Sequence, residues 1–280
     1  MKDKAFWSKN TFAIQGKEFN TPIVMGILNV TPDSFYDGGN FLVEEAIETQ
    51  AKKMIAEGAT IIDVGGYSSR PNAVDVPVEV EMDRVTNAIK CIRSFDKEIL
   101  ISVDTFRASI AEKAMKVGAT IINDISGGQL DAQMYPLVAE AQIPYIMMHM
   151  RGTPQTMPSL TDYKDVTKEV ITFFKQKIEA LTALGIHQLI VDPGFGFAKT
   201  VEQNYTLLNA LETLDELQLP LLVGVSRKSM IYKKLGITAA ESLNGTSILN
   251  TVALLKGASI LRVHDVKSAV EAVKLVNSLQ

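Results

Sequence analysis

The sequence predicts an α/β fold, a single (β/α)8 TIM barrel with a short N-terminal hairpin that caps the barrel bottom. Short runs rich in β-branched residues alternate with longer amphipathic segments along the 280 residues. The short runs are continuously apolar, as strands of a parallel sheet covered on both faces are. Eight such runs, each followed by a helical pattern, favour a closed barrel over a doubly wound open sheet, which usually has fewer strands.

The elements follow one another without an evident linker, so the whole chain, residues 1–280, is predicted to be one domain. Residues 11–20, with Gly16 at a turn, predict the hairpin. The predicted strands are 23–29, 60–65, 99–105, 120–124, 144–149, 188–192, 221–226 and 259–264. The predicted helices are 42–57, 78–94, 106–117, 131–141, 162–184, 201–217, 239–256 and 266–278.

Composition excludes several classes of protein. The net charge is −4 and no block of Lys or Arg stands out, which argues against nucleic acid or an anionic membrane as a partner. The apolar runs are too short to span a bilayer, and the first residues carry no secretory signal. Cys91 is the only cysteine, so no disulfide forms within the chain, and a cytoplasmic location is expected.

Polar side chains stand at the end of every predicted strand. They are Asn29, Asp63, Asp104, Asn123, Asp124, His149, Asp192, Ser226, Arg227, Lys228, Arg262 and His264. An Asp or Asn at a strand end, such as Asp104 or Asp124, has an alternative interpretation as a helix N-cap, but capping alone does not explain all eight strands. Because enzymes with this fold place their sites at the C-terminal rim of the barrel, the ends are expected to converge on one pocket.

The chemistry of these residues differs from the barrel axis to the rim. Asp104, Asn123 and Asp192 offer hydrogen-bond acceptors near the axis, which suit a flat ring with adjacent N–H and amino donors. Nearer the rim, four groups suit an anion such as phosphate: Arg70, Lys228, Arg262 and His264. A substrate with an aminated ring at one end and phosphate at the other is therefore predicted. The histidines do not have zinc-ligand spacing, so a zinc site is not expected.

Several motifs resemble those of the dihydropteroate synthases. They are MGILNVTPDSFYDGG at 25–39, IDVGG at 62–66, SSRP at 68–71, SVDTFR at 102–107, INDISG at 122–127, MMH at 147–149, DPGFGF at 192–197, GVSRKSM at 224–230 and RVHD at 262–265. The first and the GVSRKSM motif are the most specific. The resemblance implies an enzyme of folate biosynthesis that joins 6-hydroxymethyl-7,8-dihydropterin diphosphate to p-aminobenzoate, uses Mg²⁺, forms a homodimer and is a sulfonamide target.

The resemblance also implies roles for individual residues. The pterin would be bound by Asp104, Asn123, Asp192 and Lys228, with Met147, Phe197 and Gly224 lining its slot and Arg262 stacking on it. The diphosphate would be bound by Asn29, Ser69, Arg70, Arg262 and His264, with Asn29 also binding Mg²⁺. The p-aminobenzoate pocket would comprise Ser229, Lys228, Phe35 and Pro71. Lys228, Arg262, His264 and Arg70 would form the catalytic set.

One segment departs from the family pattern, because residues 66–72 read GYSSRPN where the family commonly has GESTRPG. Tyr67 therefore replaces a carboxylate, whereas Ser69 keeps a hydroxyl. Loops 31–41 and 67–76 are expected to act as lids that exclude water.

Two alternative functions stay open. One is a methyltetrahydrofolate-binding methyltransferase barrel, which has no use for a diphosphate-binding Arg, and the other is a catalytically silent paralogue that binds pterin.

Overall fold

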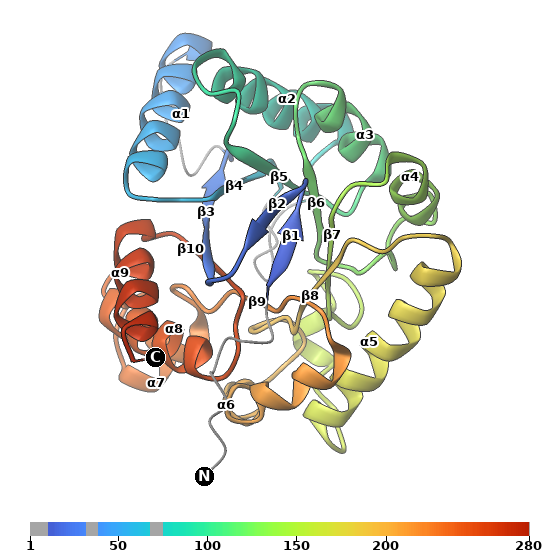
Figure 1. Cartoon of the computed structure of the whole chain (residues 1–280), viewed down its shortest axis with the longest axis vertical. Coiled ribbons are helices and arrows are strands. Elements are labelled where there is room, and N and C mark those ends of the chain that lie inside the picture. The colour runs from blue at the N-terminus through green and yellow to red at the C-terminus, as the bar shows by residue number, and fades with distance from the viewer. Residues whose placement is uncertain (1–10, 32–38, 68–74, 280) are drawn as a thin grey trace.

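The strands close into a barrel in the computed structural model, which describes residues 11–31, 39–67 and 75–279. The parallel strands are β3 (Ile23–Asn29), β4 (Ile61–Gly65), β5 (Leu100–Asp104), β6 (Ile121–Asp124), β7 (Tyr145–Met148), β8 (Leu189–Asp192), β9 (Leu222–Val223) and β10 (Ile260–Val263). Their order is β8-β7-β6-β5-β4-β3-β10-β9. A parallel bridge between Val191 and Leu221 joins the two ends of this order, so the ring closes and the predicted barrel is confirmed (Figure 1).

The helices lie around the ring of strands (Figure 1). They are α1 (Gly39–Ala56), α2 (Val78–Phe95), α3 (Ala108–Lys116), α4 (Met134–Ala141), α5 (Val166–Ala183), α6 (Val201–Asn209), α7 (Ser229–Leu235), α8 (Leu243–Leu255) and α9 (Val266–Asn277), with 3₁₀ turns η2 (Met157–Ser159) and η3 (Leu211–Leu217). Among the residues that the structure describes, no helix has the length and apolarity to cross a membrane.

Two predicted helices are wrong in detail. The segment 201–217 is not one helix, since α6 ends at Asn209 and η3 continues as a 3₁₀ helix. The buried residues Leu208, Leu211, Leu214 and Leu217 recur every third position, a period that matches three residues per turn better than 3.6. The helix predicted at 239–256 starts only at Leu243, and the separate helix α7 precedes it.

Two other boundaries also moved. The strand predicted at 221–226 is reduced to Leu222–Val223, and residues 224–226 enter a loop. The helix predicted from 162 begins at Val166, because the side chain of Asp165 accepts a hydrogen bond from the Lys168 backbone N–H and caps the helix there.

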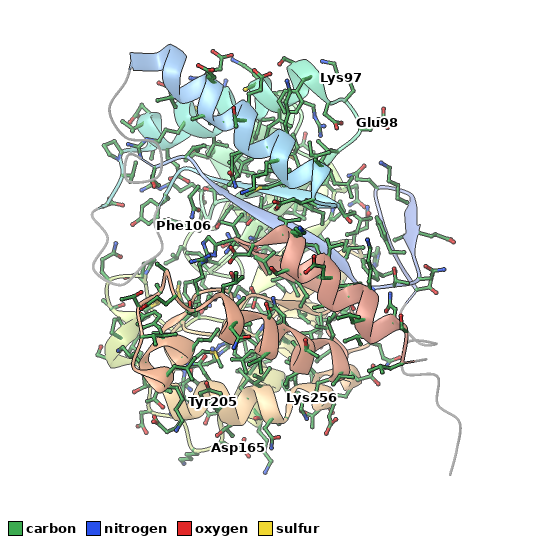
Figure 2. The ribbon with its side chains drawn as sticks, turned by 90° about the vertical axis from the view of Figure 1, so that its left-hand side faces the viewer. Lys97, Glu98, Phe106, Asp165, Tyr205 and Lys256 are labelled. Carbon is green, nitrogen blue, oxygen red and sulfur yellow. The ribbon has the colours of Figure 1, made fainter. Side chains whose placement is uncertain are left out.

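The hairpin lies across the N-terminal end of the barrel, as predicted. Its strands are β1 (Phe12–Ile14) and β2 (Lys17–Phe19), which pair antiparallel. Gln15 and Gly16 both have left-handed φ, at 51° and 73°, as a tight two-residue hairpin turn requires. Phe12 and Ile14 pack against the lower residues of the barrel strands. Figure 2 shows the hairpin at one end of the barrel and Phe106, in the β5–α3 loop, at the other.

Side chains alternate along each strand between two environments. One set, including Met25, Ile61 and Ile146, fills the lower barrel interior together with the hairpin. The other set, including Val24, Ile62 and Tyr145, packs between the barrel and the helices. Since the alternation continues to the strand ends, it decides which end residues face the barrel axis.

Candidate functional site

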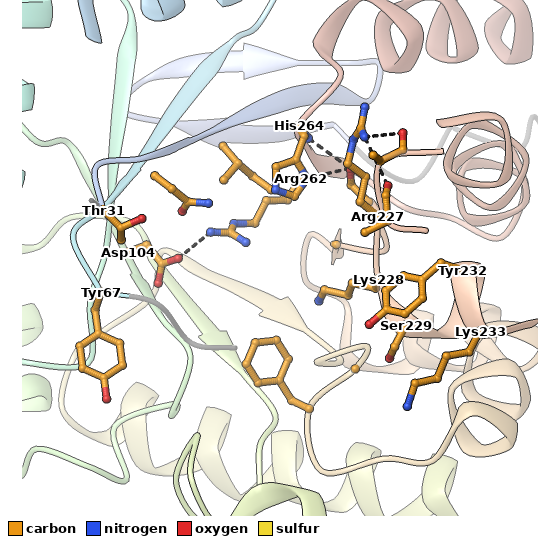
Figure 3. Close-up of a pocket in the computed structure, with 18 of the residues that line it drawn as sticks. Thr31, Tyr67, Asp104, Arg227, Lys228, Ser229, Tyr232, Lys233, Arg262 and His264 are labelled. Atoms are coloured by element: carbon orange, nitrogen blue, oxygen red, sulfur yellow. Dashed lines mark hydrogen bonds and ion pairs between the residues drawn. The ribbon is translucent and has the colours of Figure 1, made fainter. Parts of the chain in front are cut away.

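A pocket with a volume of about 820 Å³ opens at the C-terminal ends of the strands. Its walls include Ile27, Asn29, Thr31, Tyr67, Asp104, Met157, Gly196, Phe197, Gly224, Ser226, Arg227, Lys228, Ser229, Tyr232, Lys233, Ala239, Ala240, Arg262 and His264. In Figure 3, Thr31, Tyr67 and Asp104 lie on one side, Lys228, Ser229, Tyr232 and Lys233 on the other, and Arg262 between them. Segments that are far apart in the chain therefore meet around one cavity.

An arginine held between two carboxylates forms the floor. Arg262 donates from Nε to Asp63 Oδ2 at 2.6 Å and from Nη2 to Asp104 Oδ2 at 2.5 Å. Asn123 Nδ2 also donates to Asp63 Oδ2, at 3.1 Å. Burial raises the pKa of Asp104, and the Arg262 guanidinium opposes that shift. Burial disfavours the charge on Arg262 itself, but Asp63 and Asp104 outweigh it and raise the pKa of the guanidinium above its ordinary value.

A second acid–base pair lies beside this floor. The side chain of Asp192 is buried and its Oδ1 accepts a hydrogen bond from the Gly194 backbone N–H at 2.8 Å. Lys228 Nζ donates to the carbonyl oxygen of Phe195 at 2.5 Å and lies 4.8 Å from the centre of the Phe197 ring. Burial raises the pKa of Asp192, and burial lowers the pKa of Lys228 to about 8. Each charge opposes the shift of the other, so the two groups act as a pair.

Asn29 is the only residue of the predicted set assigned to a metal. A Cβ at Gly65 would lie 3.6 Å from both Asn29 Oδ1 and Asp104 Oδ2, so this glycine leaves room between two oxygen groups. Within the described ranges, no group of three or more His, Cys, Asp or Glu residues forms a metal cage. Mg²⁺ in proteins commonly keeps several waters and substrate phosphates as ligands. The residues therefore fit a cation that arrives bound to a diphosphate and gains one amide oxygen.

The remaining rim residues are held by hydrogen bonds. Ser226 Oγ lies 3.0 Å from His264 Nδ1. Arg227, with a left-handed φ of 55°, forms a bidentate pair with Asp265 at 2.9 and 2.8 Å. Its guanidinium also donates to the carbonyl oxygens of Ala239 and Ala240. Arg227 thus ties the start of α9 to the segment before α8, while the next residue, Lys228, stays available to the cavity.

Most of the predicted site residues that the structure describes come together here. Asn29, Asp104, Phe197, Gly224, Lys228, Ser229, Arg262 and His264 line the pocket. Asn123 contacts the floor through Asp63, and Asp192 lies close enough to Lys228 and Arg262 for their charges to act on it. Phe35, Ser69, Arg70 and Pro71 lie outside the described residues, so their roles stay predictions.

The prediction for Met147 is wrong. Its side chain is buried in the layer between barrel and helices, whereas the next residue, Met148, packs with Ile125 and Met157 above the barrel interior. The reason is the alternation along β7, which turns neighbouring side chains to opposite faces. Asp124 and His149 share the outward position and do not line the cavity. Asp124 instead accepts hydrogen bonds from Ser126, Gly128 and Tyr145.

Several pocket residues were not singled out from the sequence. Tyr232 and Lys233 belong to α7, the helix that the hydrophobic pattern did not reveal, and Met157 belongs to η2. The sequence marks Tyr67 only as a departure from the family pattern. In the structure its hydroxyl accepts a hydrogen bond from Gln155 Nε2 at 3.0 Å and its ring packs edge-on to Phe106. Recognising α7 between β9 and α8 would have found two of these residues.

His149 should make the stability of the protein depend on pH. Burial, reinforced by the nearby charge of Lys199, lowers the pKa of His149 from 6.5 to about 2. Below its ordinary pKa the unfolded chain binds a proton that folded His149 does not, so stability falls as the pH falls. The loss from this residue should be about 2 kcal/mol between about pH 6.5 and pH 5, at 1.36 kcal/mol per unit.

Chemical denaturation of the wild type and of His149→Gln at several pH values measures this effect. The substitution should flatten the pH dependence in that window. His187 is exposed, so His187→Gln is the matched control and should keep the wild-type slope. An unchanged slope in His149→Gln would mean that His149 is not the titrating group.

Residues 25–264 match the family model described as "Pterin binding enzyme". The chain is 43% identical to the dihydropteroate synthase of Synechocystis over 98% of this chain and 91% of the relative. It is 45% identical to the Escherichia coli enzyme over 93% of each chain. The chain belongs to the dihydropteroate synthase family.

Solved structures of dihydropteroate synthases have the same fold. The Yersinia pestis enzyme, solved with a sulfonamide drug, superposes with a TM-score of 0.89 at 38% identity and covers 96% of this chain and 99% of its own. The Xanthomonas albilineans enzyme with 4-aminobenzoic acid has a TM-score of 0.88 at 37% identity and covers 95% and 96%. Dihydropteroate synthesis, a step of folate synthesis, is therefore the activity of the chain.

Proposed function

We propose that the chain joins 6-hydroxymethyl-7,8-dihydropterin diphosphate to p-aminobenzoate in this pocket and releases 7,8-dihydropteroate and diphosphate. The observation that carries the proposal is that the cavity brings together two sets of charged groups. The first is the acids Asp63, Asp104 and Asp192, and the second is two cations, Arg262 between Asp63 and Asp104 and Lys228 beside them. A ring bearing amino and N–H donors complements the first set, and a diphosphate complements the second.

The floor supports binding of the pterin ring. Asp192 has a carboxylate with one oxygen oriented by Gly194, which suits two parallel hydrogen bonds from a ring N–H and its adjacent amino group. Lys228 lies near the Phe197 ring, and the absence of a side chain at Gly224 leaves space for a flat ligand beside Arg262. Asn123 would complete the polar contacts, because its amide offers both donors and acceptors.

The rim supports binding of the diphosphate. Arg262 and His264 would hold it from β10, and Asn29 from β3, with Ser69 and Arg70 contributing from residues 68–74. Asn29 would also hold Mg²⁺ carried by the diphosphate. The chemistry that bound Mg²⁺ supplies is neutralisation of the negative charge that the leaving group develops.

The second substrate would lie against Ser229 and Lys228, with Phe35 and Pro71 from the two loops closing over it. The C–O bond between the pterin methylene and diphosphate breaks, and the electron pair leaves with the diphosphate oxygen. The arylamine nitrogen forms the new C–N bond and then releases a proton to solvent. Because an arylamine is neutral near pH 7, the residues need only to orient the reactants, stabilise the leaving group and exclude water.

A stoichiometric assay tests this function. Purified protein mixed with the pterin diphosphate, p-aminobenzoate and Mg²⁺ should release diphosphate in step with dihydropteroate. Omission of p-aminobenzoate should stop both products together, and chelation of Mg²⁺ should lower the rate. Binding of the pterin diphosphate without any product would contradict the proposal and indicate a silent pterin-binding protein.

The chain would act in the cytoplasm, as its single cysteine suggests, and as a homodimer. The exposed face of α8 and α9 supports the dimer: Ile248 exposes 53% of its surface and Leu275 71%. The opposite face of α8, with Ala253 and Leu254, packs into the core. The stretch 247–256 therefore has one face that packs into the core and one apolar face toward solvent.

Ile248→Asp should shift the protein toward monomer in sedimentation velocity, because it places a charge in an apolar interface. Val80→Asp is the matched control, since Val80 is also exposed but lies on α2, away from α8 and α9 (Figure 1). A wild-type monomer at micromolar concentration, or equal effects of both substitutions, would contradict the proposed dimer surface.

A further inference from the structure

Lys199 is a buried lysine that does not line the pocket. Only 8% of its surface is exposed, which is rare for a lysine without a partner. Its Nζ donates to the carbonyl oxygens of Gly194 at 3.0 Å and Phe197 at 3.1 Å, and lies 3.0 Å from His149 Nδ1. Because burial keeps His149 neutral, its Nδ1 can accept the third hydrogen bond. Lys199 Nζ can therefore donate in all three contacts.

The loop that surrounds this ammonium has an unusual backbone. Gly194, Gly196 and Ala198 have left-handed φ of 69°, 82° and 48°, so every second residue of this loop adopts the left-handed conformation. A Cβ at Gly194 would lie 2.1 Å from the carbonyl oxygen of His149, which shows how closely the loop approaches the residue that follows β7. A side chain that binds two carbonyl oxygens of this loop at once holds a conformation that the backbone alone disfavours.

The same loop carries the contacts that hold the pterin-facing pair. The Gly194 N–H donates to Asp192, the Phe195 carbonyl accepts from Lys228, and the Phe197 ring lies beside the Lys228 ammonium. Lys199 binds the carbonyl oxygens of Gly194 and Phe197, two of the residues that make these contacts. A change at Lys199 would therefore reach Asp192 and Lys228 through one short stretch of backbone.

We propose that Lys199 is a positioning residue. Its buried side chain fixes the conformation of the loop 193–198, and the loop in turn holds Asp192 and Lys228 in the positions that bind the pterin. Lys199 acts through the loop and has no direct contact with the substrate. The inference rests on the proposed function, because it assigns the pterin to the side of the pocket that this loop forms. It predicts a defect in pterin binding that is separable from a general loss of stability.

Lys199→Met keeps a long side chain and removes all three hydrogen bonds. Titration of the protein with the pterin diphosphate and Mg²⁺ should give a Kd raised by about tenfold or more, as expected for the loss of charged hydrogen bonds that orient the site. Lys199→Gln, which keeps N–H donors without the charge, should recover part of the affinity.

Lys256→Met is the matched control. Lys256 also donates to a backbone carbonyl oxygen, that of Asn209 at 2.7 Å, but this contact lies far from the pocket. The control should leave the Kd unchanged.

A double-mutant cycle separates positioning from stability. If Lys199 acts through Lys228, then Lys199→Met should weaken binding much less in a Lys228→Met background than in the wild type. Because Lys228 bonds to the same loop and its charge acts on Lys199, the free energy of unfolding is measured in all four proteins and compared with the change in binding. Equal weakening of binding in both backgrounds, or a wild-type Kd in Lys199→Met, would overturn the proposal. If the wild type itself does not bind the pterin diphosphate, the proposed function fails first. Should Lys199→Met not fold, Lys199→Gln runs through the same cycle with the same two criteria.

Discussion

Lys228→Met should reduce kcat/KM on the order of a thousandfold, as the loss of one preorganised charged donor in an enclosed site can. Lys228 Nζ extends from the start of α7 into the pocket, where its hydrogen bond to Phe195 and its position near Phe197 fix its direction. The same change should cost less stability than the loss of Arg262, although it leaves the buried Asp192 without its nearest cation. Burial lowers the pKa of Lys228 to about 8, which means that the folded protein holds this charge at a disadvantage.

Steady-state kinetics and chemical denaturation of the same samples measure the two effects. Lys234→Met is the matched control, because Lys234 is exposed on the same helix, α7, and does not line the cavity. It should keep wild-type kinetics. Near-normal turnover in Lys228→Met would remove Lys228 from the reaction, whereas a large loss of stability would show that the inactivation is a folding defect.

Arg262→Met should produce the largest loss of stability, about 3–5 kcal/mol, because it leaves two carboxylates without their cation. Arg262 exposes 18% of its side chain and pairs with Asp63, which exposes none, and with Asp104, which exposes 14%. The buried position makes these pairs unlike a surface ion pair, where solvent screens the loss. Activity should also disappear, since the same guanidinium lies in the pocket.

The free energy of unfolding of Arg262→Met, compared with the wild type, tests this expectation. Adding Asp63→Asn should recover part of the loss, since the buried carboxylate that lacks a partner is then removed. Lys175→Met breaks an exposed pair with Glu216 and should change stability very little. A loss as small as that of Lys175→Met would mean that Arg262 is not required to balance the buried acids.

The strand register explains where reasoning from the sequence failed within the site. The sequence predicts polar groups at every strand end, but it does not show which face of the barrel each of them occupies. Asp104 and Arg262 face the axis, whereas Asp124 and Met147 face the helices. In continuously apolar strands of a parallel barrel, both faces are buried, so composition does not distinguish them. Counting in steps of two from the residues that pack against the hairpin would have separated Met148 from Met147.

Local spacing was also insufficient for the helices after β8 and β9. Leu208, Leu211, Leu214 and Leu217 are compatible with an amphipathic α-helix until packing selects the tighter 3₁₀ period. Helix α7 has only seven residues, about two turns, and begins at Ser229, within a motif whose resemblance implies binding residues and no helix. Such a short helix gains its stability from tertiary contacts, which a local pattern does not contain.

By itself the sequence determined the barrel, because eight apolar runs with helices between them leave few ways to cover both faces of a parallel sheet. It also determined the family, through motifs at the strand ends that are matched over residues 25–264. Only the tertiary structure decided that Arg262 bridges Asp63 and Asp104, and that Lys199 binds a carbonyl of the loop that also binds Lys228. The first contacts join residues that lie far apart in the chain, and the second depend on the conformation of one loop. Burial and direction, which set their energies, exist only after the chain has folded.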